Sequence, residues 1–256
     1  MGASLGGSLF VRNAIKYDYC VTEAIASLAA LCGDVFILDC QSDDGTTENL
    51  QSYCADFSNV RYQTNGDWNC ANDFNRLRIL ANSCIDQLDT DWHIMLQADE
   101  VIHEDSFGPI RMFINGNHGF RTCMVRRYNL FGDVDHYINP DLPNKPCGDV
   151  PVRLGKKGIH SIGDAETLDH IHTCQDWIQR IKIFHYGFVR NNVVDKAIDM
   201  QSWFWGPGGE SRVDGRLIEM QKSGTWEPNK LIPEQHLITI PCAHPKFSKE
   251  WANARR

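Results

Sequence analysis

Residues 35–46, VFILDCQSDDGT, carry three successive signals of an α/β fold. Four apolar residues run directly into Asp39, which is typical of a strand that is buried on both faces. The Asp-Gly pair that follows favours a turn, and Thr46 or Thr47 is expected to cap a helix. This stretch therefore predicts a buried strand, a turn and a helix in direct succession.

The same succession repeats on both sides of this stretch. Ahead of it, residues 8–11 form a short apolar run, and apolar residues recur at helical spacing through 21–32. After it, the pattern predicts a strand at 60–62, a long helix at about 72–88 and a strand at 92–96. Such alternation predicts an α/β fold with a mainly parallel sheet flanked by helices. In such folds, ligands bind beyond the carboxyl ends of the strands.

The pattern loosens after about residue 110, where Gly, Asn, Pro and aromatic residues are frequent. It tightens again at residues 181–189, IKIFHYGFV, which predict a strand, and residues 192–205 suit a helix that ends at GPGG. The tail from residue 206 is expected to be irregular. Because there is neither a repeat nor a clear linker, we expect residues 1–256 to form one domain with an elaborated second half.

The composition narrows the class of protein. The formal net charge is −8, which argues against a protein that coats nucleic acid or an anionic membrane. The ten cysteines are scattered without a CxxC pair, so reduced thiols and a cytoplasmic location are expected. No stretch has the pattern of a signal peptide or a membrane span.

Acidic residues follow two of the predicted strands. Asp99 and Glu100 come directly after the strand at 92–96, and hard oxygen ligands at such a place suit Mg²⁺ or Mn²⁺ completed by phosphate oxygens. Asp39 and Asp44 follow the strand of the opening stretch, where carboxylates and backbone N–H groups suit a ribose or a base. The alternative in both places is an ordinary solvated turn.

A third segment, FHYGFVR at 184–190, places His185 inside an apolar strand. A histidine in that position is either a metal ligand or a hydrogen-bonded core residue. Together the segments resemble glycosyltransferase family 2 of the GT-A fold, and the resemblance covers about residues 8–190. The segments that carry it are VRNAIKYDYCVTEAIAS at 11–27, DCQSDDGT at 39–46, LQADEVI at 96–102 and HYGFVR at 185–190.

The resemblance implies an inverting transfer of a sugar from a nucleotide diphosphate sugar to the hydroxyl group of an acceptor. The acceptor would be a glycan, a lipid-linked molecule or a protein, and no nucleic acid partner is implied. By this resemblance, residues of about 8–105 form a nucleotide-binding half. Residues of about 106–256 then form an acceptor-binding half with the C-terminal helices.

The resemblance also implies roles for individual residues. Contacts to the nucleotide sugar are implied for Val11, Arg12, Asn13, Asp39, Asp44, Asp99 and Arg190. Asp99 and His185 would hold Mn²⁺ or Mg²⁺. Two departures from the family pattern stand out: Gln97 replaces the first acid of the metal motif, and Cys40 replaces a second acid after Asp39.

A single inverting displacement also needs a general base for the acceptor hydroxyl. The family places an acid between the metal motif and the C-terminal helices, and GDAETLDH at 163–170 offers three acids. We favour Asp164, then Glu166, over Asp169, and the alternative is an exposed acidic turn. Two rival interpretations of the whole chain remain open: a non-catalytic GT-A-like nucleotide- or glycan-binding module, and a nucleotidyltransferase.

Overall fold

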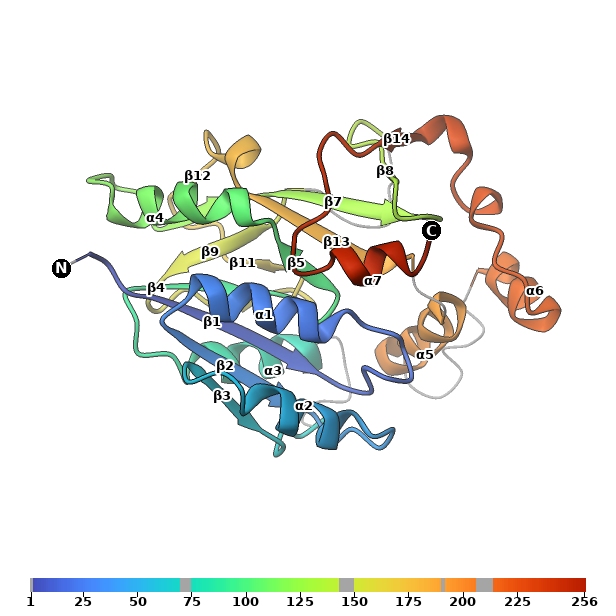
Figure 1. The fold of residues 1–256 in the computed structure, drawn as a ribbon, viewed down its shortest axis with the longest axis horizontal. Coiled ribbons are helices and arrows are strands. Elements are labelled where there is room, and N and C mark those ends of the chain that lie inside the picture. Colours follow the sequence, from blue (N-terminus) through green and yellow to red (C-terminus); the bar gives the residue numbers. More distant parts are fainter. Residues whose placement is uncertain (1, 70–74, 143–149, 190–191, 206–213) are drawn as a thin grey trace.

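The computed structural model describes residues 2–69, 75–142, 150–189, 192–205 and 214–256. Its largest layer is a seven-stranded sheet of order β12-β6-β9-β4-β1-β2-β3 (Figure 1). Strands β1 to β4 pair in parallel, and β9 is antiparallel to both β4 and β6. The strands are β1 (Leu5–Val11), β2 (Asp34–Asp39), β3 (Val60–Gln63), β4 (Trp92–Met95), β6 (Thr122–Met124), β9 (Val152–Lys156) and β12 (Thr173–Cys174).

A second sheet has the strand order β14-β8-β7-β13-β5. In it, β13 pairs in parallel with β7 and antiparallel with β5. Its strands are β5 (Glu100–Ile102), β7 (Arg126–Phe131), β8 (His136–Ile138), β13 (Lys182–Phe188) and β14 (Leu237–Thr239), and a separate pair is formed by β10 (Ser161–Ile162) and β11 (Thr167–Leu168).

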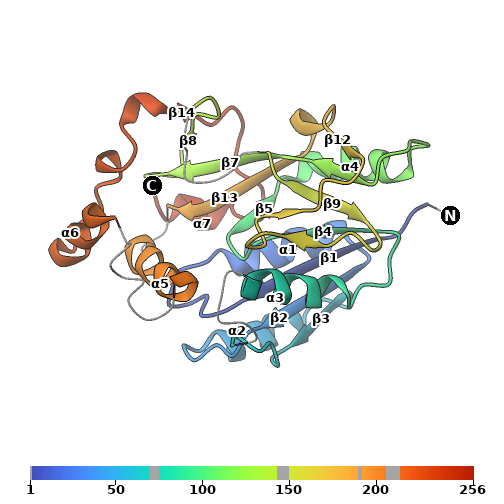
Figure 2. The ribbon, with the colours of Figure 1, turned by 180° about the vertical axis from the view of Figure 1, so that it is seen from behind.

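Helices cover both faces of the seven-stranded sheet. Helices α1 and α2 lie on the face seen in Figure 1, and α3 lies on the opposite face, seen in Figure 2. The helices are α1 (Val21–Leu31), α2 (Thr46–Cys54), α3 (Asn75–Ile85), α4 (Phe107–Asn115), α5 (Val193–Trp205), α6 (Gly215–Ser223) and α7 (Lys249–Asn253). The predicted α/β fold with a largely parallel sheet flanked by helices is confirmed.

The burial pattern explains why the first half was predictable. Strand β2 is almost wholly buried, as expected for a strand covered on both faces. In α1 the residues Ala24, Ile25, Leu28 and Leu31 are buried, and this spacing is the apolar stripe of a helix that packs on a sheet. The start of the helix predicted at about 72–88 lies outside the described residues, and its described part is α3.

The predicted threonine cap of α2 is wrong. Gly45 occupies the N-cap position with a φ of +92°, a left-handed conformation that glycine adopts without steric cost. The Thr46 hydroxyl instead accepts from the backbone N–H of Ile15, and the Thr47 hydroxyl donates to Asp39. Both threonine side chains therefore hydrogen-bond to residues near the ends of β1 and β2 instead of capping the helix.

The predicted irregular tail is also wrong for its described part, because α6, β14 and α7 form there. Helix α6 has local signals at both ends. The Asp214 carboxylate accepts from the backbone N–H of Arg216 at the start, and Gly224 has a φ of +66° at the end. In the described parts of the chain, every helix is too short or too polar to cross a membrane.

Candidate active site

A cavity of about 250 Å³ opens where the seven-stranded sheet, the second sheet and helix α5 meet. Figure 1 shows α5 beyond the carboxyl end of β1. The cavity is lined by six residues that were proposed from the sequence: Val11, Arg12, Asp99, Asp164, Glu166 and His185. Asn13 and Asp44 lie in the neighbouring strand-end loops, Asp39 is the last residue of β2, and Arg190 lies outside the described residues.

Asp99 and His185 meet because β5 and β13 are antiparallel neighbours. In this register His185 lies opposite Glu100, and the backbone N–H of Tyr186 donates to the Asp99 carbonyl at 2.8 Å. The Asp99 Oδ1 atom is thereby 3.6 Å from Nε2 of His185. The two residues are 86 positions apart in the chain (185 minus 99), so the pairing of these strands is what brings them together.

Gly187 is needed for this approach. A Cβ atom at position 187 would lie 2.5 Å from Nε2 of His185 and 3.4 Å from Oδ2 of Asp99. A separation of 2.5 Å between heavy atoms is far inside van der Waals contact. The glycine in the HYGF segment therefore leaves the space in which the imidazole faces the carboxylate.

His185 is held in one state by its surroundings. Its Nδ1 atom is 3.0 Å from Oδ1 of Asn129, an acceptor, so Nδ1 carries the proton and Nε2 keeps its lone pair. Burial lowers the pKa of His185 to about 4, although the Asp99 carboxylate acts in the opposite direction. At neutral pH the ring is uncharged with its lone pair toward Asp99, which is the form that binds metals.

Lys196 on α5 is the main site residue that the sequence did not reveal. Its Nζ atom is 3.1 Å from Oδ2 of Asp99, and it also lies 4.7 Å from the centre of the Tyr19 ring. The lysine side chain is 16% exposed and the Asp99 side chain 5%. A single lysine in an amphipathic helix carries no local signal that separates it from a surface lysine.

Asp99 and His185 fit a divalent cation as an incomplete ligand set. Across the described ranges, no cluster of three or more His, Cys, Asp and Glu residues is arranged to hold a metal ion. One carboxylate and one neutral imidazole suit Mg²⁺ or Mn²⁺, which keep several waters and take further oxygens from phosphate groups. The pair therefore suits a cation that arrives together with a phosphorylated ligand.

Glu100, the second acid of the QADE segment, is a structural residue. It is fully buried, and its Oε1 atom contacts Arg153 at 2.6 Å and Arg127 at 3.2 Å. Burial alone would raise the pKa of Glu100, but the two guanidinium groups outweigh it and lower that pKa. The two arginines therefore balance the buried negative charge of Glu100 beside the cavity.

The same two arginines fix the acidic segment that holds the candidate bases. Arg127 contacts the Glu166 carboxylate at 2.5 Å, and Arg153 donates to the Glu166 backbone carbonyl at 2.7 Å. The Asp164 carboxylate accepts from the backbone N–H of Glu166 at 3.3 Å. Arg127 and Arg153 are almost fully buried, so their contacts anchor the 164–166 segment to the protein core beside the cavity.

Asp39 has a different environment from Asp99. Its side chain is completely buried, and it accepts hydrogen bonds from the Ser42 hydroxyl at 2.7 Å, the Thr47 hydroxyl at 2.5 Å and the Tyr62 hydroxyl at 3.0 Å. The backbone N–H of Ser42 adds a fourth at 3.0 Å. Asp39 thus holds the loop after β2 in place through these hydrogen bonds, and it does not line the cavity.

Asn13 and Asp44 join the loops that follow β1 and β2. The Asn13 side chain exchanges two hydrogen bonds with Asp43, at 2.9 and 3.0 Å. The Asp44 carboxylate accepts from the backbone N–H groups of Lys16 and Thr46. Partial burial alone would raise the pKa of Asp44, but these hydrogen bonds and one from the Thr46 side chain lower it.

Trp68 is a second cavity residue that the sequence did not reveal. The guanidinium carbon of Arg12 lies 5.2 Å from the centre of the Trp68 ring, and Arg76 lies 5.5 Å from it. Arg12 also donates to the Cys40 carbonyl at 3.1 Å. These contacts, which are of the cation–π type for Trp68, hold a positive charge at the wall of the cavity.

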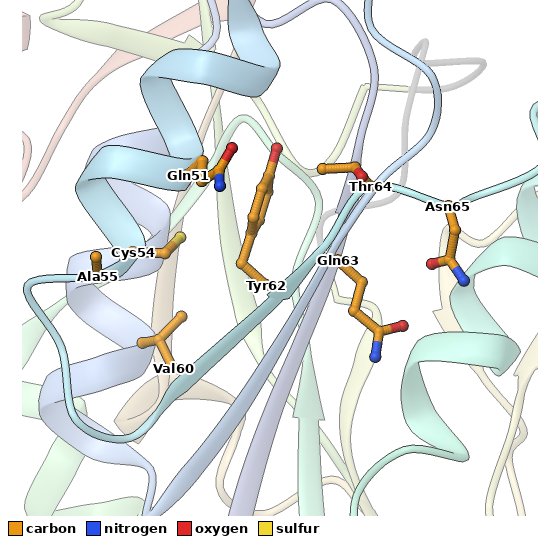
Figure 3. Close-up of a pocket in the computed structure, with 8 residues that line it drawn as sticks. All are labelled: Gln51, Cys54, Ala55, Val60, Tyr62, Gln63, Thr64 and Asn65. Atoms are coloured by element: carbon orange, nitrogen blue, oxygen red, sulfur yellow. The ribbon is translucent and has the colours of Figure 1, made fainter.

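A separate open groove lies between α2 and the edge strand β3 (Figure 3). It is lined mainly by small and uncharged polar residues, and among the described residues none of those proposed from the sequence lines it. Tyr62 connects the two regions, because it lines the groove and its hydroxyl donates to Asp39. The described residues that line this groove carry neither a carboxylate nor a cationic group.

No family model matches the sequence, and neither does any curated protein. Solved structures do match. Residues 1–349 of TarS from S. aureus are 14% identical, with 85% of this chain and 70% of that chain covered and a TM-score of 0.46. The structure of the same protein in complex with UDP-GlcNAc is 13% identical in sequence, with 85% of this chain and 71% of that chain covered and a TM-score of 0.47.

The mannosyltransferase PcManGT from Pyrobaculum calidifontis, in complex with GDP-Man and Mn²⁺, is 10% identical. That match covers 50% of this chain and 36% of the other, with a TM-score of 0.37. Such distant similarity leaves the activity of this chain to be argued from its own residues.

Proposed function

We propose that the protein is a GT-A-type glycosyltransferase of family 2 character. It transfers a sugar from a nucleotide diphosphate sugar to an acceptor hydroxyl with inversion, assisted by Mn²⁺ or Mg²⁺. The observation that carries this proposal is the meeting of Asp99 and His185 with the acids Asp164 and Glu166 in one cavity. That cavity lies at the carboxyl ends of parallel strands, where ligands of α/β folds bind.

The half formed by residues 8–105 binds the donor in this proposal. Val11 and Arg12 line the cavity, and the loops that carry Asn13 and Asp44 lie beside it. These groups suit the nucleoside and the diphosphate. Asp39 contributes by fixing the loop after β2, since its oxygens are occupied by neighbouring hydroxyl groups. A direct contact between Asp39 and the nucleoside stays a prediction, as does the role of Arg190.

The leaving diphosphate needs positive charge in the transition state. Arg12 and Lys196 both line the cavity and bring cationic groups to it. A divalent cation held by Asp99 and His185 would add Lewis-acid stabilisation of the leaving diphosphate. Gly187 and Asn129 keep the His185 ring oriented for that role.

The acceptor hydroxyl needs a base on the other side of the reacting carbon, and the 164–166 segment supplies the carboxylates. The Glu166 carboxylate is engaged with Arg127 at 2.5 Å, so it is less available to an acceptor hydroxyl. Asp164 is exposed and lines the cavity, so it is the preferred base and Glu166 the second choice. Asp169, the third acid of this segment, does not line the cavity.

The proposal is tested by binding and turnover measurements on matched variants. Calorimetry with UDP, GDP and ADP, with and without Mn²⁺, should show nucleotide binding that Mn²⁺ strengthens. Asp164→Asn should leave this binding intact and slow transfer by about a hundredfold to ten-thousandfold, the usual contribution of a general base. Asp169→Asn is the control and should retain full activity.

Two results would contradict the proposal. Binding of no nucleotide diphosphate under any condition would favour a non-catalytic module. Full transfer activity in excess chelator would remove the cation from the mechanism and leave Arg12 and Lys196 as the groups that balance the diphosphate charge.

A further inference from the structure

We propose that Lys196 is an internal counter-ion for Asp99 that keeps divalent cations from the empty site and releases the carboxylate when a nucleotide diphosphate binds. This inference rests on the proposed function, because it concerns the same donor site. It assigns to α5 a role in determining the order in which the cation and the nucleotide bind.

The contacts of Asp99 carry the inference. Its side chain is 5% exposed, and a carboxylate removed from water in this way requires a compensating positive charge. The Lys196 ammonium group is 3.1 Å from Oδ2 of Asp99, which is closer than Nε2 of His185 at 3.6 Å from Oδ1. Lys196 therefore supplies positive charge to the carboxylate in the ligand-free protein.

Helix α5 fixes the position of Lys196. Asp199, nearly one turn further along the helix, accepts from the Tyr17 hydroxyl at 2.6 Å and contacts Nζ of Lys16 at 2.7 Å. The Lys196 ammonium lies over the Tyr19 ring in the same loop. Residues 16–19 thus hold α5 against the donor half, and the lysine reaches Asp99 from an anchored helix.

A divalent cation and Lys196 cannot share Asp99 without repulsion. A cation bound by Asp99 and His185 would lie within a few ångströms of the ammonium group, and like charges at that distance disfavour each other in a buried site. In the absence of nucleotide the lysine thus competes with the cation. This competition adds to the loss of charge caused by Gln97.

A nucleotide diphosphate changes this balance, because its phosphate oxygens bring negative charge into the cavity. The ammonium group then has a second anionic partner, and the Asp99 carboxylate becomes available to the cation. Lys196 would thereby couple the two binding events, so that each ligand tightens the binding of the other by the same factor.

The test measures Mn²⁺ binding by electron paramagnetic resonance of free Mn²⁺, first with Mn²⁺ alone and then with added UDP or GDP. Lys196→Met should tighten the binding of Mn²⁺ alone by about tenfold, within the usual range of coupling between two sites. It should also weaken the binding of UDP or GDP in the absence of metal and reduce the mutual tightening. Circular dichroism checks that each variant is folded.

Lys16→Met is the matched control, since it removes the ion pair between Lys16 and Asp199 of α5 and leaves the contacts of Asp99 unchanged. It should leave the affinity for Mn²⁺ alone unchanged. Equal tightening in Lys16→Met and Lys196→Met would overturn the inference, because loosening of α5 would then explain the effect. Unchanged Mn²⁺ affinity in folded Lys196→Met would overturn it as well.

Asp99→Asn separates failure of this inference from failure of the proposed function. If Asp99→Asn abolishes Mn²⁺ binding and Lys196→Met does not alter it, the counter-ion role is wrong and the cation site stands. If Mn²⁺ binds to neither the unaltered protein nor any variant, even with nucleotide, the cation site and the counter-ion role are both wrong.

Discussion

Asp39 is the last residue of the buried parallel strand β2, and Asp99 lies in the turn that follows the buried parallel strand β4, yet their surroundings differ. Asp39 is completely buried and is held by neutral donors from Ser42, Thr47 and Tyr62. Asp99 lines a cavity and faces a charged ammonium group and a neutral imidazole. The place at a strand end therefore does not decide whether an acid builds the fold or meets a ligand.

The origin of the partners explains the difference. Asp39 at the end of β2, Ser42 in the turn and Thr47 at the start of α2 are close in the sequence, so that cluster is mostly local. The partners of Asp99 come from β13 and α5, about ninety residues later. The local partners of Asp39 satisfy its hydrogen bonds within one short segment. The distant partners of Asp99 instead line a cavity that a ligand can enter.

The largest expected effect is on activity at Asp99. Asp99→Asn preserves the shape of the side chain and removes its charge, so transfer should fall by about a thousandfold, or about 4 kcal/mol of transition-state stabilisation. The free energy of unfolding should fall by about 1 to 2 kcal/mol, less than the loss in activity, because the mostly buried Lys196 ammonium group loses its partner. Steady-state kinetics and urea unfolding measure the two quantities, and equal losses in both would erase the contrast with Asp39.

The opposite pattern is expected at Asp39. Asp39→Ala leaves several buried donors without an acceptor, and the free energy of unfolding should fall by about 3 kcal/mol. Loss of nucleotide affinity should follow only from disorder of the loop after β2. If urea unfolding shows an unchanged stability while calorimetry shows weaker nucleotide binding, Asp39 contacts the ligand directly. Asp39 and Asp99 would then both be ligand-binding residues.

A smaller effect is expected at Gly187, which sharpens the role of His185. Gly187→Ala would displace the imidazole, and the Mn²⁺ affinity in the presence of nucleotide should fall by about tenfold, or 1.4 kcal/mol. Gly108→Ala is the control, since an added Cβ there meets nothing within 4 Å. Mn²⁺ titration of both variants makes the comparison, and unchanged affinity in Gly187→Ala would show that the ring does not contact the cation.

The remaining prediction concerns the pH dependence of stability in the presence of chelator. Burial lowers the folded-state pKa of His185 to about 4, and the ordinary value is near 6.5. The unfolded chain therefore binds more protons between these values, and stability falls as the pH decreases from about 6.5 to about 4. The slope is at most about 1.4 kcal/mol per pH unit for each such histidine.

Matched variants assign this slope. His93, buried beside the Ile159 carbonyl, has a pKa lowered to about 4 by burial and contributes in the same direction. In a His93→Gln background, His185→Asn should flatten the slope further, whereas Thr47→Ala in the Asp39 cluster should not. Urea unfolding at a series of pH values measures this, and an equal slope in all three proteins would remove the pH contrast between the clusters.

The sequence by itself determined the sheet of the first half and the acids at its strand ends. Apolar runs such as 35–38 predict buried strands because burial on both faces requires continuous apolar residues. Helix α1 followed from the spacing of its buried residues. These signals depend on neighbours in the chain, so they are visible without the fold.

The tertiary structure decided how polar residues from distant segments meet. The register of β13 on β5 brings His185 to Asp99, and docking of α5 adds Lys196. The buried pair of Arg127 and Arg153 is likewise joined to Glu100 by strands far apart in the sequence. A lysine in a helix or an arginine in a strand gives no local sign of its partner, because its role arises from contacts between distant segments.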